Sequence, residues 1–334
     1  MVRDRVAEFG RVGKNSKTLE GLPMSEELLT KARIYLDQNV VSDLADGKIS
    51  IDFPDGAIIV YSKETLAEIH RSNQPEKFID ALQKLNALQI EPYVKDFKVT
   101  DECWLSFETS VERNYQAYLA AIEGFEGVEN VFDGLLAWLN GGESFAELEK
   151  LPANLEQALD SLPGMDEQQK AKLSQVDDKG WDDIVERMKT HGNDINNTRN
   201  AFGLEKGAAS NFSPEEVFEG VWSLIPKDAK KHFTLNQLFG FEPYDYEASD
   251  VIATRHESIA RCCAVFDILG YEAEKKSRKK RFIPNVRSDS THIAMASYCA
   301  CLITGDKKLI NRSRAIYSKL GYFVNMQLYQ PFES

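Results

Sequence analysis

Residues 33–47 read RIYLDQNVVSDLADG and lead from a short apolar strand, through an acidic residue, into a short helix. We expect the first four residues to form a buried strand, because parallel strands covered on both faces are apolar along their length. Asn39 is predicted to cap the helix that follows at Val40–Ala45, since its amide oxygen can accept from a free helical N–H. Asp37 then projects from the carboxyl end of the strand, where parallel sheets bind their ligands.

The same alternation of apolar strands and amphipathic helices recurs at both ends of the chain. Because the two element types alternate, the sequence predicts an α/β fold built on a doubly wound, five-stranded parallel sheet. The expected strands are 33–36, 57–61, 89–93, 301–304 and 322–326, and the expected helices are 40–45, 63–71, 75–87, 249–269, 289–299 and 307–320.

The middle of the chain has a different character. Residues 96–248 are acidic, rich in helical patterns and interrupted by glycine and proline, and strand-like runs are nearly absent. We therefore interpret 31–95 and 249–334 as one α/β domain, 96–248 as a helical insertion and 1–30 as an N-terminal arm.

Composition limits the classes of function. A net charge of -13 over 334 residues argues against a protein that coats nucleic acid through overall positive charge, but it is compatible with a nuclease that has a local basic patch. The five cysteines form no C-x-x-C pair and no zinc set with histidine, so we expect reduced thiols and a cytoplasmic protein. The first twenty residues lack the apolar core of a signal peptide, and no run suits a membrane span, so no membrane partner is expected.

Four acidic residues stand where strands are expected to give way to helices. A parallel sheet gathers such positions at the carboxyl ends of its strands. Carboxylates brought together there repel one another unless a cation neutralises them, and hard oxygen ligands suit Mg²⁺ or Mn²⁺. The candidate catalytic and metal-binding residues are Asp37, Glu68, Asp289 and Asp306, with Asn39, Thr304 and His292 in supporting roles.

Each acid also has a simpler explanation. Asp37 could be a helix-capping aspartate, although Asn39 is better placed for that role. Glu64 lies one helical turn before Glu68 on the same face, so either could be the ligand. Asp289 is expected to open a helix, where the helix dipole favours any acid. Asp306 could simply cap the helix that follows it, and a lone histidine such as His292 is often structural. The ordered set is more informative than any single member.

Four segments, YLDQNVVSDL, SKETLAEI, SDSTHIAMA and LITGDKKL, resemble the acidic motifs of PIN-domain ribonucleases. The resemblance covers about 31–95 and 250–330. It implies a three-layer α/β/α fold with a central five-stranded parallel sheet and cleavage of RNA, single-stranded or structured, with Mg²⁺ or Mn²⁺. The family includes bacterial toxins and processing enzymes, and its compact members have no counterpart of the insertion. The matching positions are Asp37 with Asn39, Glu68, Asp289, and Thr304 with Asp306.

A basic run lies close in sequence to Asp289. We predict that it contacts the nucleic-acid backbone, although a solvated loop or a partner-binding segment remains open. RNA is the expected partner and DNA the alternative, because no residue identifies a 2′-hydroxyl contact. A regulatory protein could bind 96–248, and homo-oligomers remain open. The run consists of Lys275, Lys276, Arg278, Lys279, Lys280 and Arg281.

Two rival functions remain open from the sequence. LDQNV and TGDKKLIN also resemble motifs of haloacid-dehalogenase phosphohydrolases, but that chemistry needs a second aspartate two residues after the nucleophile, where Asn39 stands. The chain could instead be an inactive nuclease-like scaffold that binds protein or RNA.

Overall fold

The computed structural model of the chain describes residues 31–95, 98–123, 203–205, 207–242, 253–273 and 283–330, with the single residues Asp133, Glu186, Asn197, Arg199 and Asn200. The expected N-terminal arm, the basic run at 275–281 and most of the expected insertion lie outside the described residues.

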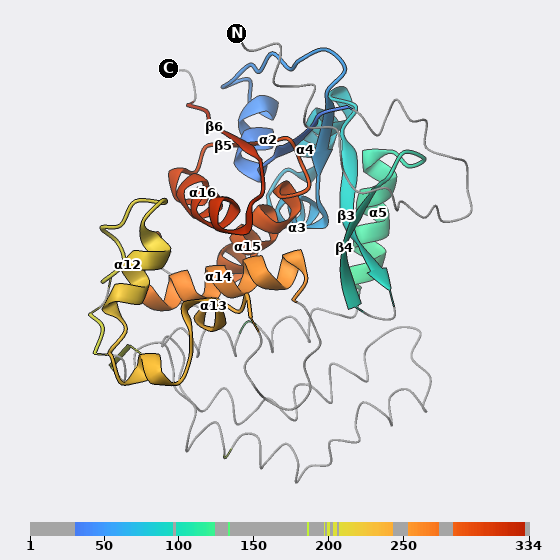
Figure 1. The fold of residues 1–334 in the computed structure, drawn as a ribbon. Coiled ribbons are helices and arrows are strands. Elements are labelled where there is room, and N and C mark those ends of the chain that lie inside the picture. The colour runs from blue at the N-terminus through green and yellow to red at the C-terminus, as the bar shows by residue number, and fades with distance from the viewer. Residues whose placement is uncertain are drawn as a thin grey trace, which may run out of the picture.

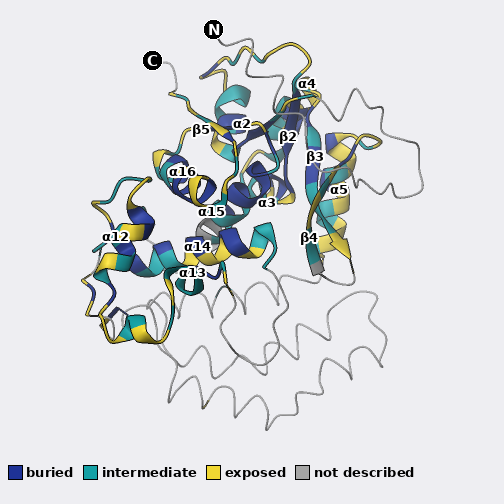
Figure 2. Ribbon diagram, viewed as in Figure 1, coloured by how far each residue is buried: buried dark blue, intermediate teal, exposed yellow. Residues whose placement is uncertain are grey.

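A six-stranded mixed sheet forms the centre of the fold, in the order β4-β3-β2-β1-β5-β6 (Figure 1). Strand β4 runs antiparallel to β3, and every other neighbouring pair is parallel. Strands β1, β2 and β5 are buried along almost their whole length (Figure 2), as their apolar sequences require. The strands are β1 (Arg33–Leu36), β2 (Ile58–Tyr61), β3 (Leu88–Lys95), β4 (Lys98–Leu105), β5 (Cys301–Thr304) and β6 (Asn325–Leu328).

The expected sheet was correct in class but not in detail. The prediction of five parallel strands missed β4, which lies in the region expected to be helical. Its sequence, KVTDECWL, mixes charged and apolar residues because it is an edge strand, so it lacks the apolar run that marks a buried strand. The last strand was expected at 322–326, but pairing with β5 sets it at Asn325–Leu328, where it is mostly exposed.

Helices cover both faces of the sheet. On β1, Ile34 and Leu36 belong to a core cluster with helices α2 to α5, whereas Tyr35 belongs to a second cluster with α12 and α14 to α16. Alternate residues of a strand point to opposite faces, so the two clusters are the two sides of one sheet. The helices are α2 (Gln38–Ala45), α3 (Lys63–Arg71), α4 (Pro75–Lys84), α5 (Val111–Ile122), α12 (Val217–Leu224), α13 (Leu235–Leu238), α14 (Arg255–Leu269), α15 (Ile283–Ala296) and α16 (Lys307–Leu320), with a 3-10 turn at Ala229–Lys231.

Part of the region expected to be an insertion packs against the sheet domain. The ring centroids of Phe218 on α12 and Phe266 on α14 lie 5.5 Å apart, and the ring of Phe239 contacts both of them. These aromatic rings share the core cluster that covers one face of the sheet. Within the described residues, no helix combines the length and the apolar character that crossing a membrane requires.

Candidate metal centre

Asp37 follows β1 directly and is 6% exposed. Its Oδ1 accepts from the backbone N–H of Gln38 at 2.7 Å, so Asp37 itself is the N-cap of α2. The expectation that Asn39 would be the cap was wrong. Asn39 lies inside the helix, and its Oδ1 accepts from the backbone N–H of Gly305 at 3.1 Å. It therefore joins the start of α2 to the turn after β5.

The parallel register of β1 and β5 brings a hydroxyl to Asp37. Leu36 pairs with Ile303, so the next residues on the two strands, Asp37 and Thr304, are neighbours. The Thr304 hydroxyl donates to Asp37 Oδ2 at 2.6 Å. Both carboxylate oxygens of Asp37 are thus held by donors, which fixes the direction of the side chain.

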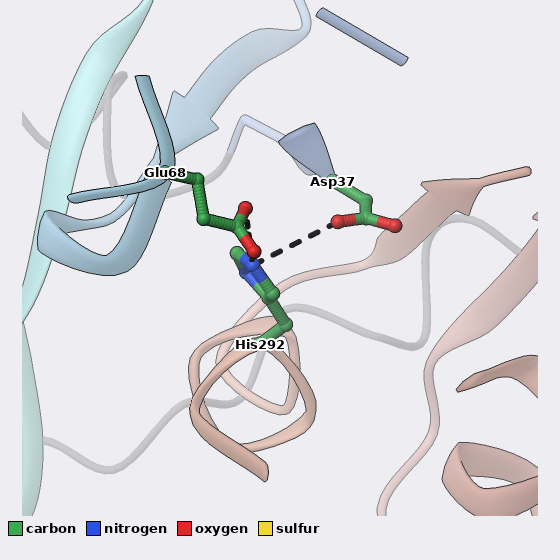
Figure 3. A group of neighbouring side chains, drawn as sticks. All are labelled: Asp37, Glu68 and His292. Atoms are coloured by element: carbon green, nitrogen blue, oxygen red, sulfur yellow. Dashed lines mark hydrogen bonds and ion pairs between the residues drawn. The ribbon is translucent and has the colours of Figure 1, made fainter. Parts of the chain in front are cut away.

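Asp37, Glu68 and His292 form a group of side chains that could hold a metal ion. Each offers one ligand atom, and these atoms lie within 4.8 Å of one another. His292 Nε2 is 3.1 Å from Glu68 Oε2 and 3.7 Å from Asp37 Oδ1. Figure 3 shows the three side chains converging from the end of β1, from α3 and from α15. Sequence analysis gave His292 only a supporting role, although the geometry places it at the centre of the group.

The second ring nitrogen of His292 faces the sheet. Its Nδ1 lies 2.6 Å from the hydroxyl of Tyr35, which lies 2.7 Å from the hydroxyl of Ser62. Tyr35 is fully buried, and Ser62 and His292 are each 2% exposed. The imidazole is therefore held at both nitrogens, with Nε2 turned toward the carboxylates.

Ser288 lies one turn before His292 on α15 and is 1% exposed. Its hydroxyl is 2.6 Å from Glu68 Oε1 and 3.0 Å from Glu64 Oε1. A hydroxyl has a single proton, so it can donate fully to only one of the two carboxylates. Glu68 enters the group with Asp37 and His292, while Glu64 reaches that group through Ser288 and also pairs with Arg71 at 3.4 Å.

Asp289 is not at the start of its helix, as the sequence suggested. Helix α15 begins at Ile283, so Asp289 lies in its second turn. Its carboxylate lies 3.8 Å from the guanidinium of Arg312, a residue only 1% exposed that also pairs with Asp267 at 3.2 Å. Burial raises the pKa of Asp289 to about 7; the Arg312 guanidinium opposes this shift, and the charge of Asp306 adds to it.

Asp306 is the N-cap of α16. Its Oδ1 accepts from the backbone N–H groups of Lys308 and Leu309 at 2.6 and 3.3 Å. Its own backbone N–H donates to the Thr304 hydroxyl at 2.9 Å. The capping role considered for Asp306 is therefore present, and Thr304 links this residue to Asp37. In the described part of the chain, the grouped ligand atoms include neither Asp289 nor Asp306.

Asp37, Glu68 and His292 shift one another's pKa values. Burial raises the pKa of Asp37 despite the opposing effect of His292. Burial would also raise the pKa of Glu68, but His292 and the Ser288 hydroxyl bring it below its ordinary value. Burial disfavours the imidazolium of His292, yet Tyr35, Glu68 and Asp37 together raise its pKa well above the ordinary value. The two buried carboxylates and the imidazole between them offer three ligand atoms to a cation.

The roles of three residues that shape this site could not be predicted from the sequence pattern. Tyr35 and Ser62 lie in segments that look like ordinary strand and helix-cap positions. Arg312 lies on an amphipathic helix, where an arginine is usually solvated. A weak signal existed for Ser288, since it precedes His292 by four residues and therefore shares its helix face.

Comparisons with known proteins do not assign the chain to a family. No family model matches it, and neither the curated proteins nor the solved structures include a match. The chemistry of the metal centre and its neighbours is therefore the basis for assigning a function.

Proposed function

We propose that the chain is a divalent-metal-dependent endonuclease of PIN type that hydrolyses phosphodiester bonds in RNA. The observation that carries the proposal is the convergence of Asp37, Glu68 and His292 within 4.8 Å, although they come from distant parts of the chain. They meet beside the carboxyl end of β1, which is where open parallel sheets bind ligands.

The architecture supports a PIN-type assignment. Five of the six strands, in the order β3-β2-β1-β5-β6, are parallel and have helices on both faces, which supports the assignment, while the antiparallel β4 has no counterpart in the sheet that the resemblance implies. Asp37, Glu68 and Asp306 occupy the strand ends and the following helices as the motifs require. Asp289 departs from the pattern in lying inside its helix rather than at its start, and both Asp289 and Asp306 lie outside the grouped ligand atoms.

The side chains have distinct roles in the proposed reaction. Asp37 and Glu68 would hold the cation, oriented by the hydroxyls of Thr304 and Ser288. A bound divalent cation lowers the pKa of its water and stabilises charge on the phosphoryl oxygens. Asp289 lies outside the grouped ligand atoms and 3.8 Å from the guanidinium of Arg312, so it would contribute negative charge beside the cation rather than ligate it.

Cleavage of labelled single-stranded RNA and DNA, with Mn²⁺, Mg²⁺ or EDTA, tests the proposal. We expect metal-dependent internal cleavage of RNA to 5′-phosphate and 3′-hydroxyl ends, lost in Asp37→Asn. The matched control is Asp46→Asn, because Asp46 is the C-cap at the other end of the same helix and pairs with Lys48 and Lys77. A folded wild-type protein that cleaves neither polymer with either cation would leave the inactive-scaffold alternative.

The phosphohydrolase alternative gains no support from the site. The residue two positions after Asp37 is Asn39, whose side-chain oxygen is used to hold Gly305. The second aspartate that this chemistry needs is replaced here by an amide, which has no acid function.

A further inference from the structure

The grouped ligand atoms are not all oxygens. Two come from the carboxylates of Asp37 and Glu68, and the third is an imidazole nitrogen of His292. Mg²⁺ is bound in proteins chiefly through oxygen and keeps several waters, whereas imidazole suits first-row transition metals. A centre that uses all three atoms would therefore discriminate between cations of the same charge.

The direction of the imidazole is set by its surroundings. Nδ1 is 2.6 Å from the hydroxyl of Tyr35, and Nε2 faces the carboxylates of Glu68 and Asp37 at 3.1 and 3.7 Å. Histidines that bind metals usually donate the N–H of their other ring nitrogen to a fixed acceptor, which determines the tautomer. Tyr35 is placed to be that acceptor for His292.

In the chain from His292 through Tyr35 to Ser62, each donor can still find an acceptor when a cation is bound. Coordination through Nε2 requires a neutral ring with its proton on Nδ1, and that N–H can donate to Tyr35. The Tyr35 hydroxyl then donates to the Ser62 oxygen at 2.7 Å. Without a cation, Nε2–H donates to Glu68 Oε2 at 3.1 Å. Tyr35 serves both arrangements because a hydroxyl can donate and accept.

We propose that His292 is a metal ligand oriented by Tyr35, and that the centre therefore selects Mn²⁺ or a similar transition-metal ion over Mg²⁺. This inference deepens the proposed function by naming the class of cation. Metal binding is measured without nucleic acid, so the two proposals can fail separately. The rival explanation is that His292 is a permanent imidazolium that occupies the cation's place between Asp37 and Glu68.

Pulsed electron paramagnetic resonance on the full chain loaded with Mn²⁺ tests ligation directly. We expect nitrogen-14 modulation from the imidazole in the wild type. This readout needs no variant, so it does not depend on a substituted protein folding. Mn²⁺ that binds without nitrogen coupling, or a folded wild type that binds no Mn²⁺, would overturn the proposal in favour of the permanent imidazolium.

Calorimetric titrations with Mn²⁺ and Mg²⁺ test selectivity. We expect the wild type to bind Mn²⁺ at least about tenfold more tightly than Mg²⁺. His292→Asn replaces the nitrogen ligand with an amide oxygen, so the ratio of the two affinities should fall toward one. An unchanged ratio in a folded His292→Asn protein would contradict the proposal.

Tyr35→Phe tests the positioning role. Removing the hydroxyl should weaken Mn²⁺ binding by about ten- to hundredfold, the usual effect of losing a group that supports a metal ligand. The matched control is Tyr61→Phe, because Tyr61 is also fully buried and its hydroxyl also has a side-chain partner, Asn114 at 2.9 Å. Equal Mn²⁺ affinity in the two variants would show that Tyr35 does not position His292.

Discussion

The hydroxyl of Thr304 donates a 2.6 Å hydrogen bond to Oδ2 of Asp37, across 267 positions of the sequence. The same hydroxyl accepts the backbone N–H of Asp306 at 2.9 Å. One buried side chain therefore fixes two of the acidic residues, and it does so because β1 and β5 are adjacent and in register.

Thr304→Val should destabilise the protein. Valine has nearly the same shape but leaves Asp37 Oδ2 buried without a donor, so we expect a loss of about 1.5–3 kcal/mol in the free energy of unfolding. Urea denaturation in EDTA measures the change. Thr291→Val is the matched control, since the Thr291 hydroxyl donates only to a backbone oxygen of its own helix at 3.2 Å. Equal losses in the two variants would contradict the special role of Thr304.

Glu68→Gln and Glu64→Gln form a matched pair on α3, because both carboxylates contact the Ser288 hydroxyl. If only Glu68 binds the cation, Glu68→Gln should lower RNA cleavage by more than about a hundredfold, beyond the range for groups that merely support a ligand. Glu64→Gln should lower it by about tenfold or less. Single-turnover cleavage rates at saturating Mn²⁺ measure both. The reverse order would make Glu64 the ligand.

Asp289 should make the metal-free protein less stable as the pH rises. Its folded-state pKa of about 7 lies above the ordinary value of 3.8, so the folded state binds the proton more tightly than the unfolded state. The resulting stabilisation is fully present below about pH 4 and is lost as the pH rises through 7. Urea denaturation in EDTA at several pH values measures this slope.

Other groups in the site also titrate, so a variant is needed to isolate Asp289. Asp37 and His292 both have raised pKa values and contribute slopes of the same sign in their own pH ranges. Asp289→Asn should flatten the profile of unfolding free energy between pH 4 and 7 and leave the remaining slope in place. An identical profile in the variant and the wild type would show that Asp289 does not carry the effect.

Arg312→Met should be strongly destabilising. Arg312 is 1% exposed and pairs with Asp267 and Asp289, so its removal takes a buried positive charge away from both carboxylates. Breaking a buried ion pair in this way costs about 3–5 kcal/mol, measurable by thermal or urea unfolding. Arg314→Met is the control, because Arg314 is exposed on the same helix. A loss of less than about 1 kcal/mol in the free energy of unfolding would mean that water stabilises the carboxylates once the guanidinium is gone.

The sequence predicted the fold where local patterns were strong. The apolar runs at 33–36 and 301–304 form strands at those residues, since buried strands have a signature that does not depend on their partners. The edge strand at Lys98–Leu105 was missed because its sequence mixes charged and apolar residues, and Asp101, Glu102 and Trp104 are exposed. Helix α15 begins at Ile283, before Asp289, with Pro284 in its first turn. Proline is tolerated in the first turn of a helix, so its position is consistent with this earlier start.

The candidate site was predictable only in part. Asp37 and Glu68 could be expected to meet, because parallel strand ends gather at one edge. The chain from His292 through Tyr35 to Ser62 could not, since a tyrosine in an apolar strand looks the same whether its hydroxyl is used or not. Arg312 was hidden for a similar reason, because only tertiary packing shows that this arginine is buried.

The place of β1 between β2 and β5 also sets when the candidate site can assemble during synthesis. Asp37 and Thr304 are 267 residues apart. At a synthesis rate of about 5–20 residues per second, roughly 13 to 50 seconds separate their emergence from the ribosome. Until His292 is made, no imidazole lies between Asp37 and Glu68. Until Cys301–Thr304 are made, one side of β1 is also unpaired. For the proposed ribonuclease, the candidate site would therefore be incomplete until residues 292–304 have been made.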